Sequence, residues 1–468
     1  MNENKLRLKD KIWYGMGDLS GNIMYSAVTF YLLYFFVTVQ GINPAFASMI
    51  FLIAKGWDAF SDYLMGNISD KTRENKYGKR RVYLLFGAIP FGLMFIFLWI
   101  NPFGVNADQV LKSIYFLLAY LLFNTTWTIV YVPYNALEVN LTKDYDERTS
   151  LNGIRIALAN IGLLLGAAIF GLLCDGSESI LYLELGNYEL AYAIGGIIFG
   201  VIASVIMLLC ALNVKEKPEN VKVNSKSFKQ TLVEFFKLKE FRNICAYYLL
   251  SMVGFDIIMS IFMFYIGDTL GFNELGGGIY TMVFIAIPLV VAILSASFWV
   301  KLTEKYSKHK VYAIAVLFIC LSLLGVMFVP RQSIVWTAVL VACVGFCMSA
   351  IQIIPFASLP DVVEVDQATY GERREGAFYG VSQFLYKFAS GVSIALVSAI
   401  LALFGYVEST GGQIISQPDS ALLAIRIVLA FVPSIMFIIS VIFAYRADLG
   451  REKFNEYKEQ INKNESEE

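Results

Sequence analysis

The sequence predicts an all-α membrane protein with twelve transmembrane helices in two six-helix bundles. Three observations support this fold class: a high content of apolar residues, a regular succession of long apolar segments, and one long polar stretch near the middle of the chain. Of 468 residues, 57% are hydrophobic and only 16% are charged, against about 25% charged residues in soluble domains. A mean hydropathy of +0.61 is typical of a chain that crosses a bilayer several times.

The apolar segments have the length that a helix needs to cross a bilayer, about 20 residues. The first segment is too long for the core of a signal peptide, so we expect it to be retained. The predicted segments are Trp13–Val39, Phe46–Met65, Val82–Ile100, Leu111–Leu137, Leu151–Cys174, Leu190–Leu212, Phe241–Thr269, Gly276–Val300, Val311–Phe328, Val335–Phe356, Ala377–Phe404 and Ala421–Tyr445.

The long polar stretch divides the chain. We predict an N-terminal bundle over residues 1–213, a central loop over 214–240, a C-terminal bundle over 241–446 and a tail over 447–468. Lys and Arg crowd the loops after the second and eighth segments and the central loop, whereas the opposite loops are nearly free of them. Because positive loops stay inside the cell, we expect a multi-pass protein of the cell membrane, a bacterial inner membrane, with both termini cytoplasmic.

The two halves resemble each other. Val132-Pro133-Tyr134 ends the fourth segment as Ile354-Pro355-Phe356 ends the tenth, about 222 residues later. The basic run Lys79–Tyr83 enters the third segment as Lys308–Tyr312 enters the ninth, about 229 residues later. Two parallel six-helix repeats joined by a cytoplasmic loop are the architecture of the major facilitator transporters.

Three charges lie on one face of the second segment. Lys55, Asp58 and Asp62 follow the spacing i, i+3, i+7, which places them on one helical stripe. Each charge at the bilayer centre costs on the order of 2.5–3.5 kcal/mol. We therefore interpret the stripe as the wall of a polar cavity. Asp58 and Asp62 are one turn apart, so the pair either binds a small cation such as sodium, with the Thr128 hydroxyl as a further ligand, or shares a proton.

Other polar side chains inside the segments line the same predicted cavity or hold helices together. Asn124, Thr128, Tyr131 and Asn135 share one face of the fourth segment, and a hydrogen-bonded helix seam is the competing interpretation. For Arg155 and Lys387, the alternative is a charge-balanced core in which they neutralise Asp58 and Asp62. The remaining candidates are Asp18, Asn22 and Tyr25 in the first segment, Arg155 in the fifth, Asp256 in the seventh, and Gln383 and Lys387 in the eleventh.

Charged residues at the cytoplasmic ends form a further candidate group. We predict that Asp70 and Arg80 in the loop after the second segment, and Asp361 and Arg374 in the stretch after the tenth segment, act as gating residues through ion pairs between the bundles. For the first pair, a solvated positive-inside loop is the alternative.

Enzymatic chemistry is not expected. The chain has one histidine, His309, in a basic loop, and its six cysteines form no C-x-x-C pair. A catalytic triad, a metal site, a cofactor site and a nucleic-acid-binding module therefore have no counterpart in the sequence. We expect a protein that works as a monomer among membrane lipids.

Taken together, these motifs resemble the glycoside–pentoside–hexuronide:cation symporter family, the melibiose permease group. The resemblance extends from the first segment to the eleventh. The matching stretches are Tyr14-Gly15-Met16-Gly17-Asp18, Trp57-Asp58-Ala59 with Asp62, Gly66 with Asp70, Val132-Pro133-Tyr134, Asp146-Glu147-Arg148-Thr149 with Arg155, Pro360-Asp361-Val362-Val363, and Gly371-Glu372-Arg373-Arg374-Glu375-Gly376 with Lys387.

The resemblance implies a sugar carrier driven by a cotransported cation, with Asp58, Asp62 and Thr128 in the cation site. It also implies that residues facing the sugar include Asn22, Tyr25, Lys55, Tyr131, Asn135, Arg155, Gln383 and Lys387. Where the melibiose permease has carboxylates for cation and sugar, this chain has Tyr131 and Asn22. The loss of the carboxylate at Tyr131 favours a proton over sodium. The cations Lys55, Arg155 and Lys387 leave the predicted cavity positive, which favours an anionic solute such as a hexuronide.

The sequence therefore predicts a symporter that couples uptake of a glycoside, pentoside or hexuronide to H⁺ or Na⁺ by alternating access. Two alternatives stay open. One is a cation-coupled symporter for an amphipathic lipid, and the other, from a different class, is a membrane sensor that transports nothing.

Overall fold

The computed structural model describes residues 6–73, 76–141, 145–175, 179–216, 235–275, 278–359, 362, 365, 375–408 and 415–447. These residues form helices joined by short turns and contain no β-strand. Ten of the described helical stretches are long and apolar enough to cross a membrane. The charged helix Pro44–Lys71 and the 17-residue helix Arg81–Phe97 bring the long helices to the predicted twelve. The all-helical membrane fold is confirmed, and the protein is a multi-pass membrane protein.

The chain packs into two compact units, each considered by itself. Unit 1 comprises Met1–Val223, Phe262–Ala286 and Ile394–Leu422, and unit 2 comprises Asn224–Ile261, Ile287–Ser393 and Leu423–Glu468. The predicted bundle boundaries at residues 213 and 241 follow the sequence repeat instead, and they stay a prediction.

The helices of the N-terminal half, in order, are α1 Leu8–Tyr34, η1 Phe35–Val39, α2 Pro44–Lys71, α3 Arg81–Phe97, α4 Gln109–Leu141, α5 Tyr145–Leu164, η2 Leu165–Ile169, α6 Phe170–Cys174, α7 Ile180–Leu185 and α8 Tyr188–Asn213. Those of the C-terminal half are α10 Lys239–Phe264, η3 Tyr265–Thr269, η4 Phe272–Leu275, α11 Gly278–Lys305, α12 Lys308–Gly325, η5 Val326–Phe328, α13 Ile334–Phe356, α15 Glu375–Leu403 and α16 Asp419–Ala447.

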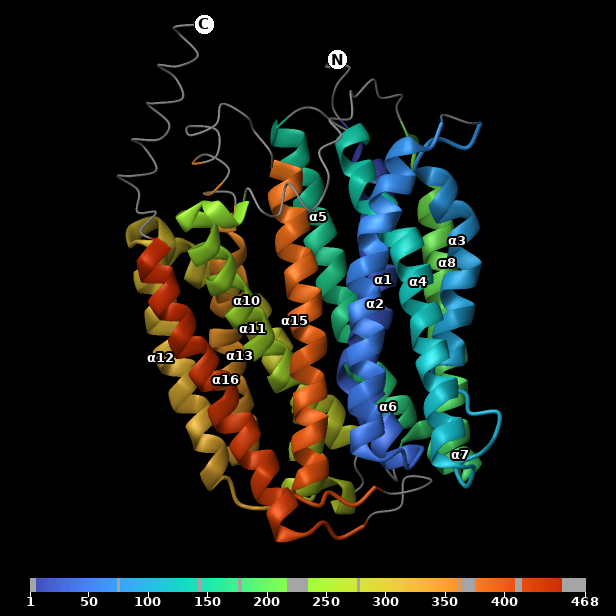
Figure 1. The fold of residues 1–468 in the computed structure, drawn as a ribbon, viewed down its shortest axis with the longest axis vertical. Helices are drawn as coiled ribbons and strands as arrows, with labels where there is room; N and C mark the ends of the chain where they lie inside the picture. The colour runs from blue at the N-terminus through green and yellow to red at the C-terminus, as the bar shows by residue number, and fades with distance from the viewer. Residues whose placement is uncertain are drawn as a thin grey trace, which may run out of the picture. The chain divides into compact units, whose positions relative to one another are not determined.

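Within unit 1, α1 and α4 occupy central positions (Figure 1). Helix α1 packs against α5 and α8, and α4 packs against α2 and α3. Glycines let α1 approach α4 closely: a Cβ on Gly17 would overlap the ring of Tyr134, and one on Gly21 would overlap the hydroxyl of Tyr131. Small residues at such a crossing are the usual way in which membrane helices pack tightly.

The end of α1 and the end of α10 repeat the same local structure. Each helix finishes in a π-helical turn, Phe35–Val39 or Tyr265–Thr269. A glycine with positive φ follows in both cases, Gly41 at 60° and Gly271 at 74°. The two turns are about 230 residues apart in the chain, close to the offsets of the sequence motifs. The internal repeat predicted from the sequence therefore has a structural counterpart at this end of the helices.

In unit 2, polar contacts tie the helices together at a few points. The Tyr312 hydroxyl of α12 lies 2.6 Å from the Ser251 hydroxyl of α10 and 2.6 Å from the Ser440 hydroxyl of α16. Before α10, the ring of Phe235 stacks on Phe378 of α15 with centroids 3.8 Å apart. Aromatic stacking of this kind fixes the start of α10 against α15.

A test of the unit 1 packing follows from Gly166, in η2. A Cβ at this position would overlap the Ile23 carbonyl oxygen and the Ser26 hydroxyl of α1. We expect Gly166→Leu to destabilise the protein by about 1–3 kcal/mol or more through overpacking, measured as a lower melting temperature in detergent. Gly66→Leu is the matched control, because nothing lies within 4 Å of a Cβ there. Equal melting temperatures for the two variants would contradict the packing described here.

Candidate functional site

Helix α4 is joined to α2 by polar side chains. The Asn124 amide donates to the Ala54 carbonyl oxygen at 2.9 Å. The Thr128 hydroxyl donates to Asp62 Oδ1 at 2.7 Å and lies 3.1 Å from the Ser61 hydroxyl. The hydrogen-bonded seam considered from the sequence is therefore present, and it brings the predicted cation ligands Asp62 and Thr128 into direct contact.

Asp58 lies one helical turn before Asp62 on α2. Asp58 is buried, with 5% of its surface exposed. The Ser61 hydroxyl donates to the backbone carbonyl oxygen of Asp58 at 3.0 Å. The hydroxyl groups of Ser61 and Thr128 and the carboxylate of Asp62 are thus in contact between α2 and α4, and Asp58 lies on the same face of α2 one turn earlier. This set consists of oxygen atoms, which hard cations prefer as ligands, and it also suits a carboxylate pair that holds a proton.

Helix α4 is joined to α1 by tyrosines. The Tyr131 hydroxyl donates to the Gly17 carbonyl oxygen at 2.6 Å, and the buried Tyr131 ring stacks on Trp127 at 4.3 Å. Tyr14 and Tyr134 exchange hydrogen bonds, each hydroxyl donating to the other's carbonyl oxygen at 2.8 Å. Tyr131 therefore serves helix packing in this structure, and its predicted contact with substrate stays a prediction.

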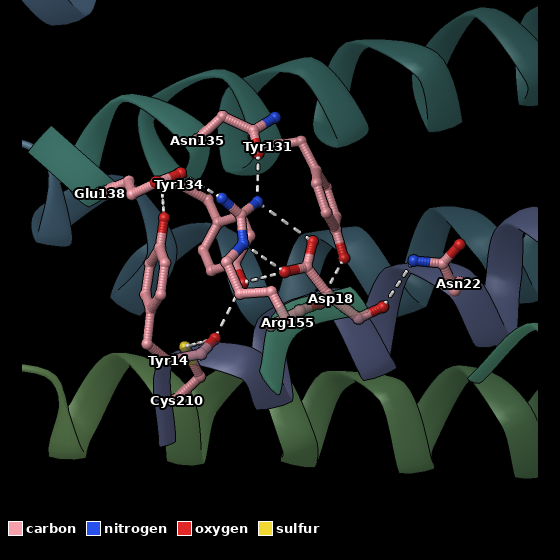
Figure 2. Close-up of polar contacts among 10 residues, drawn as sticks. Tyr14, Asp18, Asn22, Tyr131, Tyr134, Asn135, Glu138, Arg155 and Cys210 are labelled. Carbon is pink, nitrogen blue, oxygen red and sulfur yellow. Dashed lines mark hydrogen bonds and ion pairs between the residues drawn. The ribbon is translucent and has the colours of Figure 1, made fainter. Parts of the chain in front are cut away.

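Arg155 of α5 occupies the centre of this contact (Figure 2). Its Nε donates to Asp18 Oδ2 at 2.6 Å, and its Nη1 donates to Glu138 Oε2. Its Nη2 donates to Asn135 Oδ1 at 2.9 Å. The guanidinium also lies 5.2 Å from the ring centroid of Tyr14 and 5.3 Å from that of Tyr134, within the range of a cation–π contact.

The ion pairs of Arg155 are shielded from solvent. The Arg155 side chain is 13% exposed, that of Asp18 14% and that of Glu138 17%. One guanidinium and two carboxylates sum to a formal charge of −1 at this point. From the sequence we expected Arg155 to be one of three cations that make the cavity positive, with a charge-balanced core as the alternative. In this structure its two acidic partners neutralise its charge, which agrees with the charge-balanced alternative for this residue.

The two polar groups share one face of α4. Thr128 and Asn135 are seven residues apart on this helix, which corresponds to roughly 10 Å along the axis. The Asp58–Asp62–Thr128 group and the Arg155 cluster are thus two neighbouring polar groups that contact the same helix.

Several predicted substrate residues lie on the same helices as these two polar groups. Lys55 is half-buried on the α2 stripe, and a Cβ on the next residue, Gly56, would meet no atom within 4 Å. Asn135 is exposed. Asn22 donates to the Asp18 carbonyl oxygen at 2.8 Å, and Tyr25 lies 6.2 Å from Trp127, ring to ring. The partial exposure of Lys55 and the exposure of Asn135 fit groups that reach a solute.

Unit 2 holds the predicted substrate residues of the C-terminal half. The Gln383 amide donates to the Tyr248 hydroxyl at 3.0 Å. The Tyr386 hydroxyl donates to Asp256 Oδ1 at 3.2 Å, and Asp256 is only 3% exposed. Lys387 is half-buried. Helix α15 therefore carries three polar side chains, Gln383, Tyr386 and Lys387, within little more than one turn, and the first two are hydrogen-bonded to α10.

The predicted gating residues are described only in part. Arg80 is buried, its Nη1 donates to the Ala136 carbonyl oxygen at 2.6 Å, and its backbone N–H donates to Glu216 at 2.9 Å. These contacts join segments of the N-terminal half. Asp361, Arg374 and the side chain of Asp70 lie outside the described residues, so the gating role stays a prediction.

Glu138 and Ser61 were not among the predicted site residues, and the partner of Asp18 is Arg155 of α5 rather than a cation of a loop. Glu138 continues the α4 stripe, three residues after Asn135, which is the signal that would have found it. In the described part of the chain, no group of three or more His, Cys, Asp or Glu side chains is placed to hold a metal ion.

The fold and the polar groups between the helices define a class, a helical multi-pass membrane protein with charged and polar side chains inside its helices. The family model described as MFS/sugar transport protein matches residues 13–451. The chain therefore belongs to this family of the major facilitator type.

Similarity to the relatives extends over nearly the full length of this chain. The chain is 26% identical to the uncharacterized symporter YnaJ of Bacillus subtilis, covering 97% of this chain and 94% of the relative. It is 26% identical to the putative glycoside/cation symporter YagG of Escherichia coli, covering 92% and 90%. It is 25% identical to the sodium-dependent lysophosphatidylcholine symporter 1-B of Danio rerio, covering 96% and 89%.

A solved structure supports the fold. The crystal structure of the nucleoside transporter NupG superposes with a TM-score of 0.64, covering 94% of this chain and 98% of that one, at 14% sequence identity. At this identity the likeness concerns the fold alone, and it confirms the predicted major facilitator architecture.

The Arg155 cluster makes a prediction about stability. Arg155→Met leaves Asp18 and Glu138 as uncompensated, largely buried charges, so we expect a loss of about 3–5 kcal/mol, measured as a lower melting temperature. Adding Asp18→Asn to this variant should recover part of the loss. Arg7→Met breaks an ion pair with Asp10 in which Arg7 is 78% exposed, and should leave the melting temperature unchanged. Equal effects of the two arginine substitutions would contradict the assignment.

Proposed function

We propose that the protein is a secondary active symporter that couples uptake of a sugar to H⁺ or Na⁺ by alternating access. The observation that carries the proposal is the group formed by Asp58, Asp62, Ser61 and Thr128. Family membership supports the transport role, and the similarity to a putative glycoside/cation symporter supports the sugar.

In this proposal the coupling cation binds between α2 and α4. Thr128 now donates its hydroxyl proton to Asp62, and the same oxygen keeps lone pairs for a cation placed between the two side chains. Tyr131, which takes the place of a third carboxylate, has its hydroxyl committed to Gly17. Two carboxylates without a third favour the proton as the coupling ion, because a pair can share one proton.

The residues proposed to contact the solute are taken from each half of the sequence by itself. Asn135, Asn22 and Tyr25 offer amide and hydroxyl groups to sugar hydroxyls, with Gln383 as a further donor in the C-terminal half. Because Arg155 is neutralised by Asp18 and Glu138, an anionic sugar would depend on Lys55 and Lys387. The proposal of a hexuronide as solute therefore rests on these two lysines, and the neutralised Arg155 favours neutral glycosides.

A second candidate solute is a lysophospholipid. The similarity to a lysophosphatidylcholine symporter over 96% of this chain favours it. The polar side chains along α4 favour the sugar instead, because hydroxylated solutes need many hydrogen-bonding partners and an acyl chain needs none.

The coupling assignment predicts a specific transport defect. We expect Asp62→Asn, and separately Asp58→Asn, to reduce concentrative uptake in vesicles to the equilibrium level, while sugar exchange down its gradient is retained. Thr126→Ala is the control, because the Thr126 hydroxyl bonds to its own helix at the Phe123 carbonyl oxygen. Full accumulation in both aspartate variants would sink the assignment.

The solute is tested by an uptake panel. Vesicles with an imposed proton or sodium gradient are offered neutral glycosides, hexuronides and lysophosphatidylcholine. We expect gradient-driven uptake of a sugar, with Lys55→Gln and Lys387→Gln lowering the uptake of hexuronides more than that of neutral glycosides. Uptake of lysophosphatidylcholine alone would replace the sugar proposal by the lipid one.

A further inference from the structure

A hydrogen-bonded cluster in unit 1 joins segments from the two halves of the sequence. The Tyr406 hydroxyl, after α15, donates to Asp268 Oδ2 at 2.6 Å. Asn273 of η4 donates to Asp268 Oδ1 at 3.3 Å and to the Tyr34 hydroxyl of α1 at 2.9 Å. One carboxylate of the C-terminal half is therefore connected to α1 of the N-terminal half through a single asparagine.

Apolar and backbone contacts reinforce this junction. The Phe264 ring lies between Tyr34 and Tyr406, with centroids 5.5 and 5.4 Å away. The buried Ser398 hydroxyl of α15 donates to the Pro44 carbonyl oxygen at the start of α2 at 2.6 Å. The cluster lies where α1 ends in its π-helical turn, at the end of the unit remote from the start of α1. Segments from both halves thus close this end of unit 1.

A second carboxylate lies close to the junction. Asp175 follows α6, is 3% exposed, and accepts a hydrogen bond from Tyr192 at 3.0 Å. It is near enough to Asp268 for the two carboxyl groups to interact electrostatically. Among the described residues, neither Asp175 nor Asp268 forms an ion pair with Lys or Arg. Burial raises the pKa of Asp175, which lies just beyond the membrane-spanning stretch, to about 6.

The titratable groups around the two carboxylates are neutral near pH 7. Those that interact with Asp175 or Asp268 are Tyr31, Tyr34, Tyr188, Tyr192 and Tyr406 together with Cys174. Outside the membrane-spanning stretches, Asp175 is consequently the group of this cluster whose charge changes near pH 6.

We propose that Asp175, Asp268, Asn273, Tyr34 and Tyr406 form a proton-dependent latch that holds this end of the carrier closed and releases it when the carboxyl groups ionise. The inference rests on the proposed function only because an alternating-access carrier must open this end once in each cycle. Under the predicted orientation this end faces the outside of the cell.

The sign of the effect follows from proton linkage. A carboxyl group with a raised pKa in the closed state binds more protons there than in an open state, where water reaches it. Closure therefore takes up protons and is favoured at low pH. As the pH rises through about 6, keeping Asp175 buried costs progressively more, and the open state gains.

Cysteine labelling tests the latch. Ser398→Cys places a thiol at a fully buried position of the junction, and Asn106→Cys places one on the exposed loop before α4. Both full-length variants are labelled with a membrane-impermeant maleimide in right-side-out vesicles, and the parent protein gives the background from the native cysteines. The ratio of the two labelling rates cancels the pH dependence of the thiol chemistry. We expect this ratio to rise roughly tenfold between about pH 5 and pH 8.

Latch variants distinguish the proposal from a passive contact. In the Ser398→Cys background, Asp175→Asn and Asp268→Asn should keep the end closed and flatten the pH response, whereas Tyr406→Phe should raise labelling at both pH values. Two results would overturn the latch. One is an unchanged pH response in both asparagine variants, and the other is a labelling ratio of Ser398→Cys to Asn106→Cys that does not change with pH when no latch residue is substituted. Labelling requires neither a sugar nor a cation gradient, so a failure of the proposed transport function would be seen separately in the uptake assay.

Discussion

A permanent positive charge in a largely buried place is the constraint around which the N-terminal helices are arranged. Arginine cannot lose its proton in a protein, so Arg155 must find acceptors wherever α5 carries it. Asp18 on α1 and Glu138 on α4 provide carboxylates, and Asn135 provides an amide oxygen. Three helices are thereby held at one point, and the tyrosines of α1 and α4 close the contact around the guanidinium.

Most of the fold was predictable, because bilayer thickness dictates the length of an apolar helix and its composition. The twelve long helices follow from that rule, and the internal repeat follows from two pairs of motifs at similar offsets in the chain. The π-helical turns at Phe35–Val39 and Tyr265–Thr269 were not predictable, since they depend on how the ends of α1 and α10 pack rather than on a pattern of apolar residues. The grouping of Phe262–Ala286 with the N-terminal half also follows from tertiary contacts alone.

The candidate site was predictable where residues lie close in sequence or on one helix face. The α2 stripe and the α4 stripe follow from helical spacing, and their meeting at Asp62 and Thr128 agrees with the residues named from the sequence. The partners of Arg155, which are Asp18, Glu138 and Asn135, were not predictable, because a side chain of that length can reach several helices. The commitment of Tyr131 to a backbone carbonyl depends on Gly17, which spacing alone does not connect to α4.

The fit of Tyr134 over Gly17 and of Tyr131 over Gly21 bears on how this sequence can drift over time. Where a tyrosine ring from the other helix fills the space beside a glycine, that glycine cannot be replaced alone, since even the methyl group of alanine would displace the ring. The tyrosine is constrained in return, because a smaller residue would leave a void beside α1. Each glycine and its tyrosine therefore form one inherited unit, and substitutions at one position should be accompanied by a compensating change at the other.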